Sequence, residues 1–212
     1  MKLLIKTVLI FALTGAIILV FLLPGLLAFF FSFLGLRKPL QLGAYKMAQF
    51  WARLLIFFTG CSMTVTGREN IPPEGGVCFV SNHVGIFDII LALAYVGRPF
   101  GFIAKKELIL IPGLDVWIFM LGGLFLDRKK PRSAIRTIKL GIKRIKAGGG
   151  ILIFPEGTRS RGRGIAPFRS GSLRLATQSD SVIVPVALTG SYDVFEKSHR
   201  ICAVPVSISF LP

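Results

Sequence analysis

The chain opens with a long apolar run that predicts a membrane anchor. No charged residue occurs from Thr7 to Leu36, whereas Lys2 and Lys6 precede this run and Arg37 and Lys38 follow it. As one straight helix the run would be about 45 Å long, against a hydrocarbon core of about 30 Å. It does not end in a small-residue cleavage site followed by polar sequence, as a secretory signal peptide does, so we expect the chain to retain it.

A helix break is predicted in the middle of this run. Leu23-Pro24-Gly25 falls there, and a proline followed by glycine favours the end of a helix. The two remaining segments, of about sixteen and about eleven residues, are marginal or too short to span a bilayer. Basic residues flank both ends, so the positive-inside rule favours the cytoplasmic side for both. We therefore predict a helical hairpin that dips into the cytoplasmic leaflet, in preference to a single tilted span.

After the apolar run, the pattern of apolar and polar positions changes to that of a folded domain. A helix over 45–58 is predicted either to lie in the membrane interface or to cover the core. From residue 62 onward, short apolar runs alternate with helical stretches and Gly/Pro turns, which indicates an α/β fold with a largely parallel sheet flanked by helices. We divide the chain into a membrane anchor with its interfacial helix, 1–60, and a catalytic domain, 61–212. Strands are predicted at 63–66, 77–80, 100–104, 124–126, 150–154, 182–188 and 201–207, and helices at 86–95, 114–120, 133–146 and 171–177.

The charge of the chain points to an anionic partner. Lys and Arg number 26 against 10 Asp and Glu, a net charge of +16. Anionic lipid headgroups, phosphorylated substrates and nucleic acid would all be attracted by this field. The apolar leader favours membrane lipids, and no RNA-binding or helix-turn-helix signature supports nucleic acid. The helix over 133–146 carries isoleucines on one seam and cations elsewhere. It is predicted to pack on the sheet with a solvated basic face, or to bind anionic lipid or an acidic donor carrier.

The cysteines and histidines argue against a metal centre or a disulfide framework. The chain has three cysteines, widely spaced and without a CxxC pair, and two histidines. This pattern suits a reducing compartment and offers no cluster with metal-ligand spacing. We expect neither a metal nor another cofactor.

The segment from Asn82 to Asp88 is the first candidate for catalysis, because it combines an imidazole and a carboxylate after a predicted strand. A carboxylate that holds one ring nitrogen of a histidine lets the other act as a base at neutral pH. A spacing of five residues does not put both on one face of a helix. The pair can meet only if His83 lies in the loop and Asp88 points back from the first helical turn. The alternative is a helix-capping Asn82 beside a core histidine.

Three further segments place cations or glycines at predicted strand ends. Phe154–Ser160 combines Glu156, Gly157, Thr158 and Arg159 in one loop, which suits close approach to a phosphate or, alternatively, a surface turn with a local salt bridge. Gly123–Arg128 ends another strand with a guanidinium, and Lys105 follows the strand at 100–104. Val184-Pro185 is expected to end or interrupt a fourth strand. Because active sites of parallel sheets lie at the carboxyl ends of strands, we expect these segments to share a phosphate-bearing substrate.

The order of the four segments resembles that of the bacterial 1-acyl-sn-glycerol-3-phosphate acyltransferases of the glycerolipid acyltransferase superfamily. The first is Asn-His-x4-Asp, the second Gly123–Arg128, the third Phe154–Ser160 and the fourth the Val184-Pro185 strand. The likeness covers about Gly67 to Ser207 and includes Phe168-Arg169-Ser170-Gly171. The chain stops at Pro212, soon after the last predicted strand, where many members continue into a further helix. The resemblance therefore implies a minimal or shortened member.

The resemblance implies both a reaction and roles for the site residues. His83, oriented by Asp88, would take the proton of the 2-hydroxyl of 1-acyl-sn-glycerol-3-phosphate (lysophosphatidic acid) as it attacks an acyl thioester, acyl-ACP or acyl-CoA. The product would be phosphatidic acid, and nearby backbone N–H groups would stabilise the oxyanion. The glycerol phosphate would be held by Arg128, Glu156, Gly157, Thr158 and Arg159, with Lys105 as a further candidate. The implied location is the inner membrane, with the catalytic domain on its cytoplasmic face.

Three alternatives stay open on the sequence. The acceptor could instead be another lysolipid or glycerol-3-phosphate. A basic membrane-binding protein with a degenerate site is a second alternative, against which the intact His83, Asp88, Glu156 and Arg159 speak. A hydrolase is the third, but no Gly-x-Ser-x-Gly nucleophile elbow occurs. The choice of donor, the preferred chain length and the oligomeric state are not determined.

Overall fold

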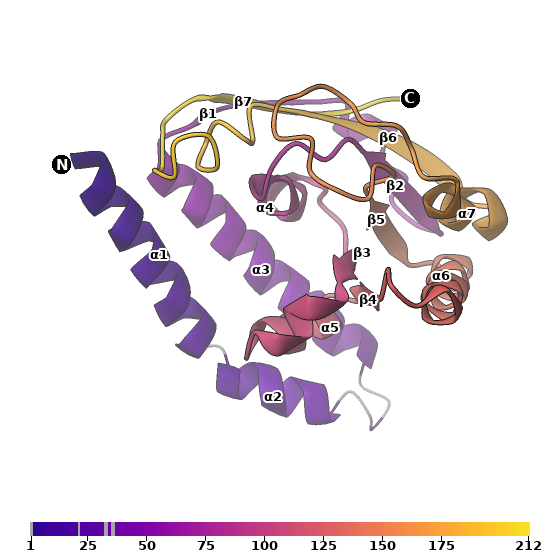
Figure 1. Ribbon diagram of the computed structural model, residues 1–212. Helices are drawn as coiled ribbons and strands as arrows, with labels where there is room; N and C mark the ends of the chain where they lie inside the picture. Colours follow the sequence, from indigo (N-terminus) through magenta and orange to yellow (C-terminus); the bar gives the residue numbers. More distant parts are fainter. Residues whose placement is uncertain (1, 21, 32–33, 35–36) are drawn as a thin grey trace.

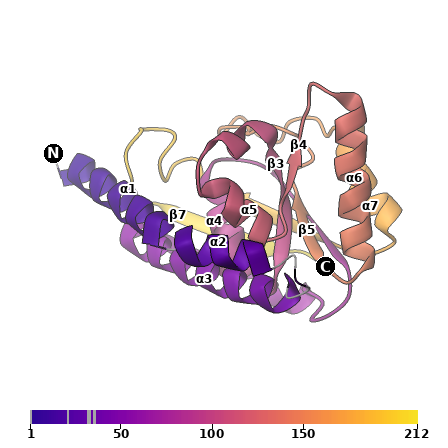
Figure 2. The same cartoon turned by 90° about the horizontal axis from the view of Figure 1, so that it is seen from below.

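The computed structural model describes residues 2–20, 22–31, 34 and 37–212. Three helices lead the chain: α1 (Lys2–Val20), α2 (Leu22–Phe31) and α3 (Arg37–Thr59). α1 and α3 run antiparallel, and α2 lies across the end where the chain turns (Figures 1 and 2). At the other end Lys6 Nζ donates a hydrogen bond to the Thr59 carbonyl at 2.6 Å. The chain therefore returns to the level of its own start before the sheet begins.

The helix break was predicted at the wrong place. α2 begins at Leu22 and runs through Pro24 and Gly25, so the Leu23-Pro24-Gly25 segment is helical. α1 ends at Val20 and α2 begins at Leu22, and residue 21 between them lies outside the described residues. Proline is tolerated there because the N–H groups of a first helical turn have no acceptor within the helix. The same residue that disrupts the middle of a helix is thus compatible with its start.

A seven-stranded sheet forms the centre of the domain, in the order β1-β7-β6-β2-β5-β3-β4. All neighbouring pairs are parallel except β6 with β7. This confirms the predicted α/β class with a largely parallel sheet. The strands are β1 (Ser62–Thr66), β2 (Val77–Ser81), β3 (Phe100–Lys105), β4 (Leu124–Leu126), β5 (Gly150–Ile153), β6 (Val182–Thr189) and β7 (Pro205–Phe210). The helices that follow α3 are α4 (Phe87–Tyr95), α5 (Leu114–Met120), α6 (Pro131–Lys146) and α7 (Ser170–Ser179), with short 3₁₀ turns η2 (Arg68–Asn70) and η3 (Lys106–Leu110).

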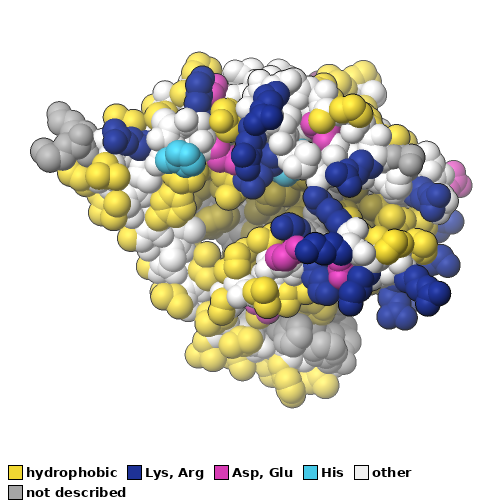
Figure 3. All heavy atoms as spheres, viewed as in Figure 1, with side chains coloured by type: hydrophobic (Ala, Val, Ile, Leu, Met, Phe, Trp, Pro, Cys, Tyr) yellow, Lys and Arg dark blue, Asp and Glu magenta, His cyan; other side chains and the backbone are white. Residues whose placement is uncertain are grey.

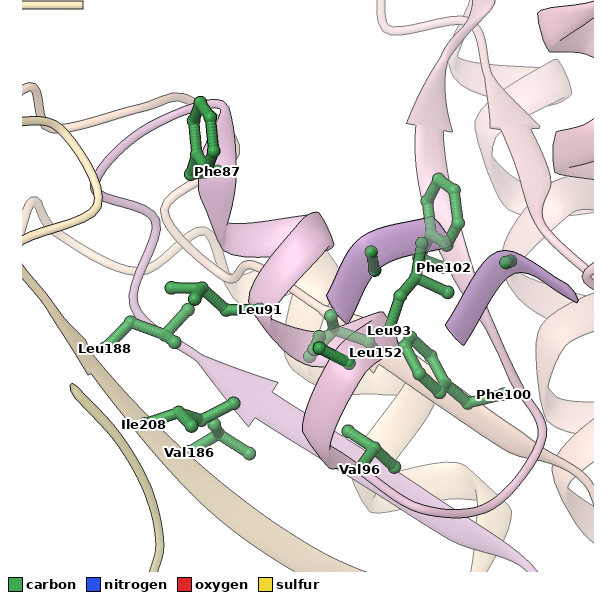
Figure 4. Close-up of a cluster of buried hydrophobic side chains, with 14 of the residues drawn as sticks. Phe87, Leu91, Leu93, Val96, Phe100, Phe102, Leu152, Val186, Leu188 and Ile208 are labelled. Atoms are coloured by element: carbon green, nitrogen blue, oxygen red, sulfur yellow. The ribbon is translucent and has the colours of Figure 1, made fainter. Parts of the chain in front are cut away.

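Helices cover both faces of the sheet, because its central strands are apolar on both sides (Figure 2). Alternate residues of a strand point to opposite faces. Phe79 of β2 and Leu152 of β5 belong to the cluster that includes α3 and α4, whereas Cys78 and Ile151 belong to the cluster under α6 and α7. Figure 4 shows Leu91 and Leu93 of α4 among the side chains of the first cluster. Burial of each large apolar side chain of this kind contributes about 1.5–3 kcal/mol to the stability of the folded state.

The last predicted strand was placed too early. β7 begins at Pro205 and ends at Phe210, whereas 201–207 was predicted. Ile201 is fully buried without belonging to a strand, and its N–H donates to Thr7 Oγ1 at 2.8 Å. An apolar run indicates burial, but here the backbone of Ile201 is bonded to α1 rather than to a neighbouring strand.

α3 covers the core, which is one of the two roles that the sequence left open, and the membrane-interface role stays a prediction. Ala48, Ala52 and Ile56 are buried in the core cluster next to α4. Phe50 and Phe57 are exposed elsewhere on the same helix. α3 thus covers the core and also presents a bare apolar surface, so it packs with the domain on the far side of the predicted boundary at residue 60. The division into an anchor and a catalytic domain stays a prediction.

Candidate functional site

His83 and Asp88 meet at the carboxyl end of β2. His83 lies in the loop after Ser81, and Asp88 is the second residue of α4. The distance from His83 Nδ1 to Asp88 Oδ2 is 2.7 Å, and the Asp88 side chain is fully buried. The carboxylate points back from the first helical turn, as the spacing of five residues requires. With Nδ1 bound to Asp88, Nε2 is the nitrogen left for a reacting group.

The histidine ring is also held from its flat side. Phe154 stacks on it with ring centroids 4.0 Å apart and an interplanar angle of 16°. Phe154 follows β5 and begins the Phe154–Ser160 loop, so this loop and the His83 loop are in direct contact. The backbone joins them further, because the His83 carbonyl accepts the N–H of Ser160 at 2.7 Å and the Val84 carbonyl accepts that of Arg161 at 3.1 Å. The His83 loop and the Phe154–Ser160 loop therefore form one rigid unit.

Glu156 connects backbone groups within this unit. It is only 2% exposed. Oε1 accepts the His83 N–H at 2.6 Å, and Oε2 accepts the Ala166 N–H at 2.9 Å. The carboxylate thus ties its own loop to the His83 backbone and to residue 166. Its contact with a glycerol phosphate stays a prediction.

Four consecutive backbone N–H groups of the His83 loop donate to carboxylates. His83 N–H donates to Glu156, and those of Val84 and Gly85 donate to Asp88 Oδ2 at 2.7 and 3.0 Å. Ile86 N–H donates to Glu196 Oε2 at 2.5 Å. These donors are therefore already engaged, and an oxyanion would have to be stabilised by other groups. The sequence pattern did not indicate Glu196, because it lies in no recognisable motif.

The predicted phosphate-binding cations lie at or just after the carboxyl ends of strands, with different partners. Arg159 Nη1 lies 2.7 Å from Glu196 Oε1. Arg128 follows β4, and burial lowers its pKa, with a further lowering by the neighbouring Arg169 guanidinium. Lys105 ends β3 and lies 3.4 Å from Glu107, with both side chains more than half exposed, so this pair is weak.

Gly157 and Thr158 complete the predicted set. Gly157 has a φ of +69°, and a Cβ atom there would lie 2.8 Å from Arg169 Nε. A larger residue would be strained and would also collide with this guanidinium. Thr158 is exposed. Arg169 was named in a sequence segment but not as a site residue, and the structure places it directly over the Gly157 backbone.

The fourth predicted segment does not end a strand. Val184 and Pro185 lie inside β6, where Val80 of β2 pairs with Pro185. Proline is accommodated because the pairing of β6 with β7 begins one residue later, at Val186. The strand continues to Thr189, and the loop that carries Glu196 follows it.

The surface around the site is strongly basic. Figure 3 shows a hollow at the centre of this face with Lys and Arg side chains beside it, and further cations over α6. Hydrophobic side chains cover the part of the same face formed by α1. Among the residues that the structure describes, no three His, Cys, Asp or Glu side chains come together as a metal site would need. The arrangement provides a held imidazole next to several guanidinium groups, which suits proton abstraction from a substrate that carries a phosphate.

Comparison with known proteins identifies a family for this chain. The sequence model of a family described as "Acyltransferase" matches residues 62–189. A 1-acyl-sn-glycerol-3-phosphate acyltransferase from Borreliella burgdorferi is 32% identical over 155 residues, which cover 73% of this chain and 62% of that protein. A protein from Mycoplasma pneumoniae, described as a probable 1-acyl-sn-glycerol-3-phosphate acyltransferase, is 31% identical over 157 residues, 70% of this chain and 57% of that protein. The chain thus spans less than two thirds of the length of either relative.

A solved structure has the same fold over nearly the whole chain. It is the 1-acyl-sn-glycerophosphate (LPA) acyltransferase PlsC from Thermotoga maritima, with a TM-score of 0.81 and 28% sequence identity. The likeness covers 99% of this chain and 84% of the other. It therefore includes the N-terminal helices as well as the sheet.

Proposed function

This chain belongs to the acyltransferase family, and on that premise we propose that it transfers an acyl chain from an acyl thioester to the 2-hydroxyl of 1-acyl-sn-glycerol-3-phosphate. The product is phosphatidic acid. The observation that carries the proposal is the contact of 2.7 Å between His83 and Asp88, beside loops rich in guanidinium groups. The names of the relatives from Borreliella burgdorferi and Mycoplasma pneumoniae support the choice of acceptor.

In the proposed mechanism His83 acts as a general base. Its Nε2 takes the proton from the acceptor's 2-hydroxyl while that oxygen attacks the thioester carbonyl carbon. Asp88 accepts the Nδ1–H bond, fixes the tautomer and stabilises the imidazolium that forms. The tetrahedral intermediate then expels the thiolate, which receives the proton from His83. The acceptor hydroxyl is itself the nucleophile, so the reaction needs no acyl-enzyme.

The phosphate of the acceptor is assigned to the predicted cations at the carboxyl edge of the sheet. Arg159 and Arg128 carry planar guanidinium groups, which can bind a phosphate through two parallel hydrogen bonds. The lowered pKa of Arg128, caused by burial and by Arg169, supports a position where a bound anion would be stabilised. Lys105 contributes a more exposed charge. The donor is an acyl-ACP or an acyl-CoA, both of which are anionic.

We further propose that the N-terminal helices hold the enzyme on the cytoplasmic face of the inner membrane as a hairpin within one leaflet. Among the described helices, α1 alone is long and apolar enough to cross a membrane, over Leu3–Val20, and only 11% of that window is buried. Two contacts support the hairpin. α1 lies against α3, which is itself part of the core, and Lys6 is bonded to Thr59 beside the sheet. A helix packed in this way along the catalytic domain suits a position in the membrane surface better than a span.

The experiment that tests the proposed function is an acyl-transfer assay on the purified full-length chain. Lysophosphatidic acid, another lysophospholipid and glycerol-3-phosphate would be offered in turn, each with acyl-ACP and with acyl-CoA. The expected result is phosphatidic acid from lysophosphatidic acid, with little product from the other acceptors. Preference for another acceptor would replace the proposed substrate, and absence of transfer to all three would overturn the function.

A further inference from the structure

Glu196 joins two parts of the site that are far apart in the sequence. It lies in the loop 190–204 between β6 and β7, and its side chain is 14% exposed. Oε1 accepts a hydrogen bond from Arg159 Nη1 at 2.7 Å, and Oε2 accepts the Ile86 N–H at 2.5 Å. One carboxylate thus contacts both the guanidinium of the Phe154–Ser160 loop and the backbone that follows His83.

We propose that Glu196 is a positioning residue of this site, which orients Arg159 toward the acceptor's phosphate and holds the His83 loop through Ile86. This inference rests on the proposed function. Glu196 does not touch the reacting atoms, and it acts through the two groups that it binds. No motif in the sequence and no part of the proposed mechanism otherwise requires a carboxylate at this position.

The fit between the loop 190–204 and the His83 loop supports this role. A Cβ atom at Gly85 would lie 2.8 Å from Glu196 Oε2 and 3.0 Å from the backbone of Tyr192. The absence of a side chain at Gly85 is what lets the carboxylate reach the Ile86 N–H. The two loops are therefore complementary in shape, and the position of Glu196 is determined by backbone as well as by Arg159.

The chemistry of the guanidinium explains why a carboxylate beside a phosphate site is useful. A guanidinium has five N–H donors in a fixed plane, and Glu196 accepts at only one of its terminal nitrogens. The other donors are left for a phosphate. An arginine held in place beforehand loses less side-chain freedom when the acceptor binds. Because the Arg159–Glu196 pair is neutral as a whole, attraction over a distance falls to Arg128, Arg169 and the surrounding lysines.

The loop that carries Glu196 is itself held by the N-terminal helix. The ring of Phe195 packs edge-on against Phe11 of α1, with centroids 5.1 Å apart. The Ile201 N–H donates to Thr7 Oγ1 in a buried hydrogen bond of 2.8 Å. α1 therefore supports this loop. Phe195 is the neighbour of Glu196, so the apolar helix is connected to Arg159 through two adjacent residues.

In a competing interpretation, Glu196 occupies the phosphate-binding position on Arg159, and the phosphate of the acceptor displaces the Glu196 carboxylate when it binds. The two interpretations predict opposite signs. If Glu196 competes with the phosphate, its removal lowers the KM for the acceptor. If it positions Arg159, its removal raises that KM. The second contact, to Ile86, favours positioning, because a carboxylate bound on both sides cannot leave Arg159 without also releasing the His83 loop.

The test compares Glu196→Gln with a matched control in the same loop. In a glutamine, an amide NH₂ group replaces one of the two carboxylate oxygens. It therefore cannot accept from Arg159 at one oxygen and from the Ile86 N–H at the other, as Glu196 does. The control is Asp193→Asn. This change removes the ion pair between the exposed side chains of Asp193 and Lys197, in which Oδ1 and Nζ lie 3.0 Å apart. We expect Glu196→Gln to raise the KM for 1-acyl-sn-glycerol-3-phosphate about tenfold with a smaller effect on kcat. Asp193→Asn should leave both constants and the Tm unchanged.

Two additions make the test specific for Arg159. In an Arg159→Ala background, Glu196→Gln should no longer change the KM, because Arg159, through which Glu196 affects binding of the phosphate, is gone. Glu196→Asp keeps the charge but is too short to reach both partners, so it should raise the KM in the same direction if the glutamine variant is too unstable to assay. Additive effects of the two substitutions, or a KM that falls in Glu196→Gln, would overturn the inference.

A binding measurement separates this inference from the proposed reaction. Glycerol 3-phosphate would be titrated onto the detergent-solubilised full-length protein and followed by calorimetry. Binding by the wild type that weakens about tenfold in Glu196→Gln, and not in Asp193→Asn, supports positioning even if no acyl transfer occurs. Equal binding by wild type and Glu196→Gln would refute it. Absence of binding by the wild type would count against both the inference and the proposed acceptor.

Discussion

His83 Nδ1 lies 2.7 Å from Asp88 Oδ2. The same oxygen accepts the N–H groups of Val84 and Gly85, so one buried atom both orients the imidazole and closes the turn into α4. The carboxylate also sits at the positive end of that helix, where a negative charge is stabilised. Orientation of the base and initiation of the helix are therefore inseparable in this loop.

Replacement of either partner should affect turnover differently. His83→Ala removes the base, and we expect a fall in kcat of at least about 10²–10⁴-fold, to background in most assays. Asp88→Asn can keep an oxygen for the three donors but loses the charge that stabilises the imidazolium. It should lower kcat with little change in the KM for the acceptor. Steady-state kinetics of both folded variants, checked by circular dichroism, measure this. Near-normal turnover by His83→Ala would exclude the mechanism.

Glu156→Gln should lower both stability and turnover. Its single amide oxygen can accept only one of the His83 and Ala166 N–H groups, and the amide nitrogen would face the other donor. Loss of a buried hydrogen bond to a charged group costs about 1.5–3 kcal/mol, so the Tm should fall and kcat with it. The control is Glu69→Gln, an exposed carboxylate in η2. A higher KM for the acceptor at unchanged Tm would instead favour direct contact with the glycerol phosphate.

Arg159 and the cations of α6 should respond differently to salt. Arg159→Lys loses the planar guanidinium, which can form two parallel hydrogen bonds to a phosphate. The KM for the acceptor should therefore rise about ten- to a hundredfold, corresponding to about 1.5–3 kcal/mol, and stay raised at high salt. Lys139 and Lys143 are exposed on α6, and their replacement should change membrane or donor binding in a way that fades as salt rises. A salt titration of the kinetics of both variants measures the difference. If Arg159→Lys followed the α6 variant, its assignment to the phosphate would fail.

Labelling can decide the topology of the N-terminal helices. If they form a hairpin in one leaflet, tags at residue 1 and residue 40 should both react with reagents added from the cytoplasmic side. Reaction from opposite sides would mean that the apolar run spans the membrane. Removal of residues 1–36 should release or weaken membrane binding, with some binding kept by the basic surface. This truncation also removes Thr7 and Phe11, which support the loop 190–204, so its effect on kinetics should not be attributed to the membrane alone.

The sequence by itself determined the fold class and most of the elements. The bounds of α5 (Leu114–Met120) and β4 (Leu124–Leu126) are those predicted, because each is a short apolar run closed by glycine or charge. Parallel strands must be connected by crossovers, and their carboxyl ends meet at one edge. Local pattern was therefore sufficient to place His83, Lys105, Arg128 and the Glu156 loop at the same edge of the sheet.

Only the tertiary structure decided which partner each polar side chain has. Glu156 binds a backbone N–H 73 residues away, Glu196 binds one 110 residues away, and Thr7 binds one 194 residues away. Such contacts leave no periodic signal in a sequence, because a backbone N–H is the same at every residue and only the fold brings a particular one within reach. For the same reason the hydrogen bond between Ile201 and α1 could not be predicted from the sequence. The candidate residues of the four segments follow from local pattern, whereas Glu196 and the hydrogen bonds of the site follow from the way distant loops pack together.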